Sequence, residues 1–190
     1  MNICAFAGSA NPNDKRYVEV ARDSGTQIAR RDHNLVYGGS RLGLMGVISK
    51  AVKDAGGYVI GIIPEMFKYL AEGENELIIV SDFNQRLREM ESRSDAFIAL
   101  PGGIGCLYEI FDVLQNRQVN NHTKPLILLN TLGFYNNLRS QLERAITDGF
   151  IPEENRGMWY MTETPSQALD YIEQYKPSKM PDKIGFAQNS

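Results

Sequence analysis

The segment at residues 95–109, DAFIALPGGIGCLYE, combines a strand-like apolar run, a glycine-rich loop and a carboxylate. A proline ends the apolar run, and three glycines follow before a helical pattern that carries Glu109 in its first turn. Glycines let a ligand approach the backbone closely, and the free N–H groups and dipole of a helix N-terminus attract anions. We therefore expect a phosphate at this loop and Glu109 facing another part of the same ligand, an arrangement that suits a phosphorylated sugar.

Short apolar runs alternate with longer amphipathic runs along the chain, and these elements must position the loop. The apolar runs predict strands at 2–7, 34–37, 58–63, 76–80, 96–100 and 126–129. The amphipathic runs predict helices at 14–31, 44–55, 84–93, 106–118, 136–147 and 165–175. Strand and helix in alternation predict an α/β protein: a Rossmann-like doubly wound parallel sheet with helices on both faces.

Glycine clusters lie at the ends of three predicted strands. Ligands of such sheets bind beyond the carboxyl ends of the strands, near the point where the strand order reverses. We therefore predict that three loops converge on one phosphate- and nucleotide-binding edge. The predicted binding residues are Gly8, Ser9, Gly38, Gly39, Ser40, Met45, Met90, Pro101, Gly102, Gly103, Gly105 and Cys106.

Several common site patterns are absent from the sequence. Neither G-x-x-x-x-G-K-[ST] nor G-x-G-x-x-G occurs, and the sequence has no H-E-x-x-H and no paired-cysteine spacing. Ser40 resembles the serine of a nucleophile elbow, but Leu42 stands where the second glycine of that pattern is required. Simple kinase, NAD-dependent and serine hydrolase functions lose their usual support, and we predict neither a metal nor a cofactor.

The composition is that of an ordinary globular protein. The 190 residues are 43% hydrophobic with a net charge of −3, which favours neither nucleic acid nor a membrane as a partner. We predict one nucleotide-binding domain at 1–175 and a loosely held polar tail at 176–190. Two cysteines, no signal-peptide pattern and no apolar run of about 20 residues predict a cytoplasmic protein.

Each candidate also has a purely structural interpretation. Ser9 and Ser40 could bind phosphate or could merely cap helices. Cys106 could be a nucleophile activated by a helix N-terminus, although a small residue that packs the loop is the favoured interpretation. Glu109 could serve only to complement the helix dipole, and Arg86 could be a solvated helix residue.

Several segments, taken in order, resemble one family. They are 37–40 (YGGS), 43–46 (GLMG), 61–64 (GIIP), 101–109 (PGGIGCLYE), 122–125 (HTKP) and 148–151 (DGFI). Each segment alone is weak evidence, but their order and spacing resemble the LOG ("lonely guy") family from about residue 3 to about residue 151. The family has long been misannotated as lysine decarboxylases.

The resemblance implies a dimeric Rossmann-like fold without a metal. It implies cleavage of the N-glycosidic bond of an adenine-type nucleoside 5′-monophosphate, AMP or a cytokinin riboside monophosphate, to free base and ribose 5-phosphate. The implied catalytic pair is Arg86, whose pattern with Met90 resembles R-K-x-x-M, and Glu109, the last residue of P-G-G-x-G-T-x-x-E.

That chemistry also suits the residue types themselves. Breaking a nucleoside C–N bond builds positive charge on the ribose. The carboxylate of Glu109 can stabilise this charge and orient or deprotonate water. The guanidinium of Arg86 can hold the phosphate with two hydrogen bonds or act at the leaving base.

The sequence departs from the family pattern around this pair. The family threonine is Cys106, the first acid of the usual Glu-Glu pair is Tyr108, and the lysine after the arginine is Leu87. Asn116 replaces a tryptophan, and 83–84 (FN) replaces a Met-His pair. These changes keep a second function open, that of a non-catalytic nucleotide binder or molybdenum-cofactor carrier of related fold.

Overall fold

The predicted apolar runs, together with one further segment, form a single seven-stranded sheet in the computed structural model, which describes residues 1–181. The strands are β1 (Asn2–Phe6), β2 (Asn34–Tyr37), β3 (Val59–Pro64), β4 (Glu76–Val80), β5 (Ala96–Ala99), β6 (Leu126–Leu129) and β7 (Tyr160–Thr162). Their order is β4-β3-β2-β1-β5-β6-β7, and every neighbouring pair is parallel. The order therefore reverses between β1 and β5, which confirms the predicted doubly wound sheet.

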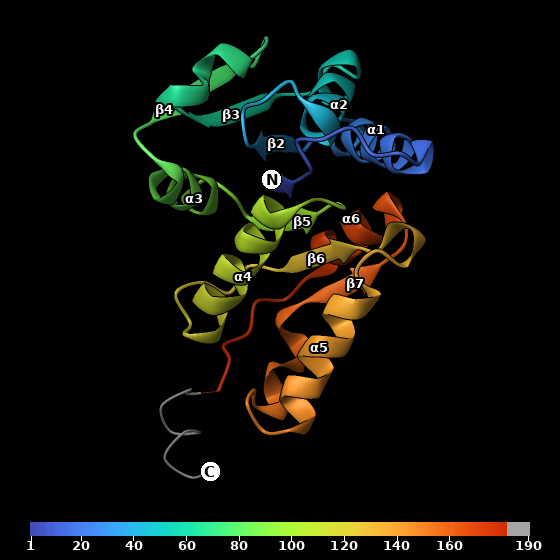
Figure 1. The fold of residues 1–190 in the computed structure, drawn as a ribbon, viewed down its shortest axis with the longest axis vertical. Helices are drawn as coiled ribbons and strands as arrows, with labels where there is room; N and C mark the ends of the chain where they lie inside the picture. Colours follow the sequence, from blue (N-terminus) through green and yellow to red (C-terminus); the bar gives the residue numbers. More distant parts are fainter. Residues whose placement is uncertain (182–190) are drawn as a thin grey trace.

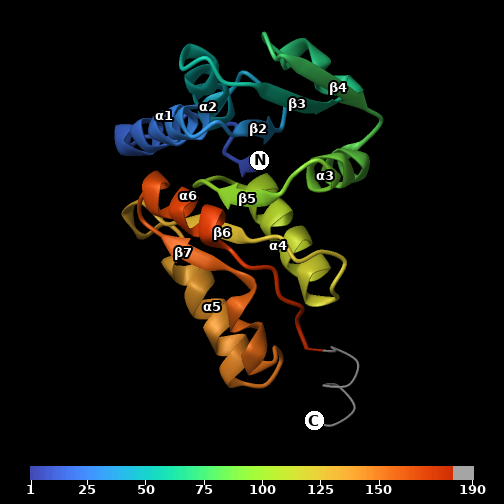
Figure 2. The ribbon, with the colours of Figure 1, turned by 180° about the vertical axis from the view of Figure 1, so that it is seen from behind.

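Two layers of helices cover the sheet (Figures 1 and 2). Helices α1 (Lys15–Arg30), α2 (Gly43–Asp54) and α6 (Pro165–Gln174) pack on one face. Helices α3 (Phe83–Ser92), α4 (Ile104–Gln118) and α5 (Asn136–Thr147) pack on the other. Short 3₁₀ helices lie at η1 (Glu65–Leu70), η2 (Thr131–Gly133) and η3 (Glu153–Met158). No helix within residues 1–181 is long and apolar enough to cross a bilayer.

Short polar side chains start three of the helices. Asp14 accepts a hydrogen bond from the backbone N–H of Arg16, Asp82 from that of Gln85, and Thr164 from that of Gln167. Such side chains satisfy N–H groups that have no partner within the first turn of a helix. The predicted cap of α1 at Asp14 is confirmed.

Two details of the prediction are wrong. β7 was not predicted, because its three residues are too few to show an alternating pattern and it lies at the edge of the sheet. Helix α4 begins at Ile104, two residues before the predicted start, with Gly103 as its N-cap. Glu109 therefore lies in the second turn of α4 and not in the first, and its side chain is buried.

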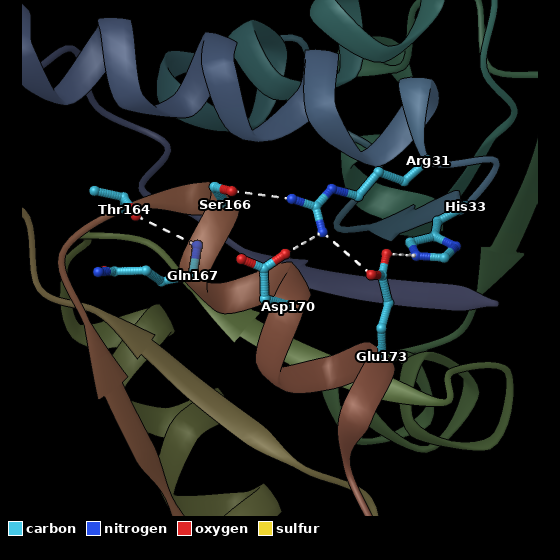
Figure 3. A network of polar contacts seen from close by, with 7 residues as sticks. All are labelled: Arg31, His33, Thr164, Ser166, Gln167, Asp170 and Glu173. Carbon is cyan, nitrogen blue, oxygen red and sulfur yellow. Dashed lines mark hydrogen bonds and ion pairs between the residues drawn. The ribbon is translucent and has the colours of Figure 1, made fainter.

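The last helix is tied to the end of α1 by a polar network (Figure 3). Arg31 forms ion pairs with Asp170 at 2.6 Å and Glu173 at 3.2 Å, and it donates to the hydroxyl of Ser166 at 3.0 Å. His33 contacts the other oxygen of Glu173 at 3.1 Å. These contacts fix α6 against the first half of the sheet, so His33 has a structural role.

The chain continues from α6 towards the end of α4. Met180 is buried, its backbone N–H donates to the side chain of Asn120 at 2.8 Å, and its carbonyl accepts from the same side chain at 3.0 Å. The first residues of the predicted tail 176–190 are thus held against α4. Residues 182–190 lie outside the described residues.

Helix α1 approaches α2 closely because Gly25 has no side chain. A Cβ added at Gly25 would lie 2.5 Å from the carbonyl oxygen of Ile48 and 2.9 Å from the Cβ of Ala51. We expect Gly25→Ala to lower the free energy of unfolding by about 1–3 kcal/mol, because the two helices must move apart. Urea unfolding measures this change.

A matched control for this substitution is Gly157→Ala. No heavy atom lies within 4 Å of a Cβ added at Gly157, and its φ is not positive. An equal loss of stability in both variants would contradict the close approach of α1 and α2.

Candidate active site

A cavity of about 400 Å³ opens at the carboxyl ends of β1, β2, β3 and β5. Its walls come from the loop after β1, the β2–α2 loop, the β3–η1 segment, α3 and the start of α4. This position, at the reversal of strand order, is where doubly wound sheets bind ligands.

A buried ion pair forms the polar end of the cavity. Arg86 of α3 contacts Glu109 of α4, with 2.8 Å between Nη1 and Oε1, and the two side chains are 11% and 8% exposed. The Nε of Arg86 also donates to the carbonyl oxygen of Ile62 at 3.1 Å. The residues predicted as the catalytic pair are thus side by side, from helices that precede and follow β5.

Gly38 makes room for the guanidinium of Arg86. A Cβ at this position would lie 1.9 Å from Nη2 of Arg86 and 2.9 Å from the sulfur of Met45. Any side chain at residue 38 would therefore displace Arg86 from its place beside Glu109.

The environment of Glu109 makes its carboxylate a stronger base than usual. Burial raises the pKa of Glu109 above the ordinary carboxyl value, and the charge and hydrogen bond of Arg86 offset part of that rise. Between the ordinary pKa and this raised pKa, the folded protein holds a proton that the unfolded chain has released. The contribution of this group to stability therefore falls as the pH rises through that window.

The N-termini of α2 and α4 differ in their capacity to bind an anion. The carbonyl oxygen of Gly8 accepts from the N–H groups of Leu44 at 2.8 Å and Met45 at 3.4 Å, so it occupies the start of α2. Helix α4 has Gly103 as its N-cap, without a side-chain hydrogen bond, and its first residues line the cavity. The start of α4 is therefore the better candidate for an anion site.

Cys106 lies in this first turn as a protonated thiol. It is buried and lines the cavity, and a Cβ added at Gly102 would lie 2.2 Å from its sulfur. Burial and, next, the charge of Glu109 raise the pKa of Cys106 to about 12. Because the thiolate is the nucleophile, this environment favours the packing role over nucleophilic catalysis.

The predicted binding residues divide into three groups. Those that line the cavity are Gly8, Ser9, Gly38, Ser40, Met45, Gly103, Gly105 and Cys106. Gly39, Pro101 and Gly102 shape the loops behind it, Gly39 with a positive φ of 69°. Met90 does not line the cavity: it is packed in the core beneath α3, because it faces the sheet on that helix. The Ser40 hydroxyl accepts from the N–H of Leu42 at 3.2 Å, which is the local bond of a turn.

An apolar wall of the same cavity was not predicted. Phe67 and Leu70 come from η1, and Phe83 starts α3, with ring centroids of Phe67 and Phe83 5.9 Å apart. Ile63 and Pro64 continue this wall from the end of β3. The sequence feature that could have indicated this wall is the aromatic content of 65–70 (EMFKYL), directly after a strand that ends at the predicted binding edge.

Most of the departures from the family pattern lie outside the cavity. Leu87 is packed in the core, Tyr108 is half exposed and donates to Asn84 at 3.1 Å, and Asn116 donates to Glu91 at 2.9 Å. Of the substituted positions, Cys106 and Phe83 line the cavity. Among residues 1–181, no group of three or more His, Cys, Asp or Glu side chains is placed to hold a metal ion.

Comparisons with known proteins match most of the chain. A family model described as "Possible lysine decarboxylase" matches residues 45–172. The probable cytokinin riboside 5′-monophosphate phosphoribohydrolase LOGL2 of Oryza sativa subsp. japonica is 40% identical over 178 residues, which are 92% of this chain and 73% of that protein. The cytokinin riboside 5′-monophosphate phosphoribohydrolase LOG5 of Arabidopsis thaliana is also 40% identical, over 92% of this chain and 78% of that protein.

Solved structures share the fold. The molybdenum cofactor binding protein from Rippkaea orientalis has a TM-score of 0.68 and 26% identity, covering 90% of this chain and 93% of that chain. The Moco carrier protein from Chlamydomonas reinhardtii has a TM-score of 0.70 and 22% identity, covering 91% and 95%. The second likeness, at this identity, is evidence for the fold alone.

Fold and site together define an α/β protein that holds a buried arginine–glutamate pair beside a glycine-rich anion loop. The family model spans more than half of the chain, and the relatives named above exceed 30% identity over most of their own length. The chain therefore belongs to the LOG family.

The contact between Gly38 and Arg86 is open to a direct test. We expect Gly38→Ala to lower the free energy of unfolding by about 3 kcal/mol, because its Cβ breaks a buried ion pair. In a Glu109→Gln background the same substitution should cost less, since the ion pair is already lost. Urea unfolding of the four proteins measures this coupling, and additive losses would contradict it.

Proposed function

We propose that the protein is a hydrolase that cleaves the N-glycosidic bond of adenine-type nucleoside 5′-monophosphates, AMP or cytokinin riboside monophosphates, to free base and ribose 5-phosphate. The observation that carries the proposal is the buried pair of Arg86 and Glu109, which lines the same cavity as the uncapped N-terminus of α4. Identity of 40% to phosphoribohydrolases of two plants supports the same activity.

The phosphate of the substrate binds at the backbone N–H groups that begin α4, where the helix dipole favours negative charge. The ribose then lies towards Glu109, whose carboxylate stabilises the positive charge that develops as the C–N bond breaks. Its raised pKa suits it to accept a proton from the attacking water. Arg86 holds this carboxylate in place and presents its Nη2 beside Gly38 as a further donor.

The apolar wall receives the base. Phe67, Phe83 and Ile63 offer aromatic and aliphatic contacts to a planar ring and to an apolar substituent on it. The ionic end and the apolar end of the cavity therefore match the two ends of an adenine nucleotide. A decarboxylase that uses a lysine Schiff base has no support here, because no lysine lines the cavity among the described residues.

A second candidate function is a nucleotide or molybdenum-cofactor carrier without catalysis. The likeness to the molybdenum cofactor binding protein from Rippkaea orientalis favours it. The Arg86–Glu109 pair favours the hydrolase, since a carrier of anions gains nothing from a buried carboxylate beside its ligand.

We expect purified protein to release ribose 5-phosphate from AMP or from isopentenyl-AMP, and Glu109→Gln to slow this release at least 100-fold, because the glutamine lacks a basic oxygen. Chromatography of the free base measures the rate for each nucleotide. Glu91→Gln is the matched control: Glu91 is another carboxylate whose pKa is raised by burial, and it lies outside the cavity. Tight nucleotide binding without release of base would favour the carrier.

We also propose a homodimer formed along the exposed face of α4. Ile104, Tyr108 and Phe111 lie along one stripe of this helix and are 82%, 50% and 46% exposed. Ile104 also lines the cavity, so a second copy seated there would border the substrate. A cytoplasmic location stays a prediction, supported by the two free thiols, Cys4 and Cys106.

Analytical ultracentrifugation tests the dimer. We expect Phe111→Glu to shift the protein from dimer to monomer, because a charge placed in an apolar interface loses its hydration. Tyr69→Glu is the control, since Tyr69 is 67% exposed and lies on η1, outside the apolar stripe of α4. A wild-type monomer, or a dimer that Tyr69→Glu disrupts and Phe111→Glu does not, would contradict the proposed face.

A further inference from the structure

The glycine loop before α4 is held from behind by a buried tyrosine that does not line the cavity. Tyr135, at the N-cap of α5, is 1% exposed, and its hydroxyl donates to the carbonyl oxygen of Leu100 at 2.6 Å. Leu100 lies between β5 and the loop 101–103. The side chain of Tyr135 thus holds the last peptide before loop 101–103, the proposed anion loop.

The hydrogen bond from Tyr135 satisfies the carbonyl oxygen of Leu100, which the sheet leaves without a partner. Pairing between β5 and β6 ends at Ala99 and Leu128, and the N–H of Leu100 is already bound to the carbonyl of Phe6 at 2.8 Å. The next residue, Pro101, has no N–H and restricts the backbone before it. With Tyr135 in place, both polar groups of Leu100 are fixed, and so is the direction in which the loop leaves the strand.

The loop has little room to move once this peptide is fixed. A Cβ on Gly102 would lie 2.2 Å from the sulfur of Cys106 and 3.1 Å from the backbone nitrogen of Gly8. The loop is therefore packed between α4 and the glycine turn after β1. Rotation of the Leu100–Pro101 peptide would move the N–H groups at the start of α4 relative to the Arg86–Glu109 pair.

Tyr135 is itself held by the chain that precedes it. Its backbone N–H donates to the side chain of Asn130 at 2.7 Å, and the amide of Asn130 donates to Asn136 at 3.0 Å. The backbone N–H of Asn130 donates to the carbonyl of Thr162 in β7 at 2.7 Å. A continuous set of hydrogen bonds thus runs from the edge of the sheet to the anion loop.

We propose that Tyr135 is a positioning residue for the phosphate: its hydroxyl, through Leu100, sets the loop whose N–H groups receive the 5′-phosphate of the substrate. The inference rests on the proposed function for the identity of that phosphate. Tyr135 acts through the loop: its hydroxyl bonds to Leu100, and Arg86 bonds to Glu109 and Ile62, so we expect the ion pair to keep its geometry without the hydroxyl.

Tyr135→Phe removes the hydroxyl alone and isolates its role. We expect the Kd for AMP to rise about tenfold, because this is the typical effect of losing one hydrogen bond to a buried group. The Kd for adenosine, which has no phosphate, should stay unchanged. In turnover of AMP the KM should rise by the same factor and kcat should be retained. Titration calorimetry and initial rates measure the two quantities.

Tyr175→Phe is the matched control. The hydroxyl of Tyr175 accepts from Arg117 at 2.6 Å, so this variant also loses one short, partly buried hydrogen bond, and neither residue belongs to the loop. Equal weakening of AMP and adenosine by Tyr135→Phe would overturn the proposal, because a general loss of structure affects both ligands. No change in either Kd would overturn it as well.

Amide hydrogen exchange separates this inference from the proposed hydrolase. In the protein without ligand, Tyr135→Phe should speed exchange at Gly102, Gly103 and Gly105, and Tyr175→Phe should not. If the wild-type protein binds AMP without cleaving it, the hydrolase falls, and the affinity ratio still decides the role of Tyr135. If the wild-type protein does not bind AMP, both the hydrolase and the phosphate-positioning role of Tyr135 are wrong. If amide exchange at the three glycines is also unchanged in Tyr135→Phe, Tyr135 does not position the loop either.

Discussion

The buried ion pair between Arg86 and Glu109 is the constraint on which the site depends. With their side chains only 11% and 8% exposed, the two charged groups lose much of their hydration energy. A buried ion pair of this kind therefore contributes little net stability. The fold nevertheless accommodates it at several points. A glycine at position 38 leaves space for the guanidinium, and the carbonyl of Ile62 accepts its Nε. Because the pair links α3 to α4 across the reversal of strand order, its cost is better explained by chemistry than by folding.

The two helix N-termini at the binding edge have different tasks, although both follow glycine-rich loops. The start of α2 is occupied by the carbonyl of Gly8, so the β2–α2 loop and Met45 in the first turn of α2 shape the cavity and offer no anion site. The start of α4 is left to a ligand. The cavity therefore has one polar end, at the start of α4 and the Arg86–Glu109 pair, and one apolar end, defined by η1 and Phe83. This polarity restricts the ligands to molecules with a charged and an apolar end.

Much of this arrangement could be predicted from the sequence, because strands that are buried on both faces read as continuous apolar runs and glycines mark where they end. The convergence of Gly8, Gly38 and Gly103 followed from the parallel sheet alone. The position of Glu109 could not be predicted in this way, because the glycines at 102, 103 and 105 obscure where α4 begins. The helix begins two residues earlier than predicted, so the carboxylate lies in the buried second turn and not in the solvated first turn. The apolar wall was missed because 3₁₀ helices carry no strong periodicity, and Met90 was misplaced because its helical face could not be assigned from one sequence.

The thiol at position 106 changes the anion loop less than the substitution alone suggests. A hydroxyl there would add one side-chain donor, yet the proposed phosphate would be bound chiefly by backbone N–H groups and the dipole of α4, which the substitution leaves intact. The sulfur, protonated and packed against Gly102, supports the loop from within α4. Tyr135 supports the same loop from α5 through Leu100. The loop is thus fixed by its own packing before any ligand arrives, and such preorganisation lowers the entropy lost on binding, which compensates in part for a weaker side-chain donor.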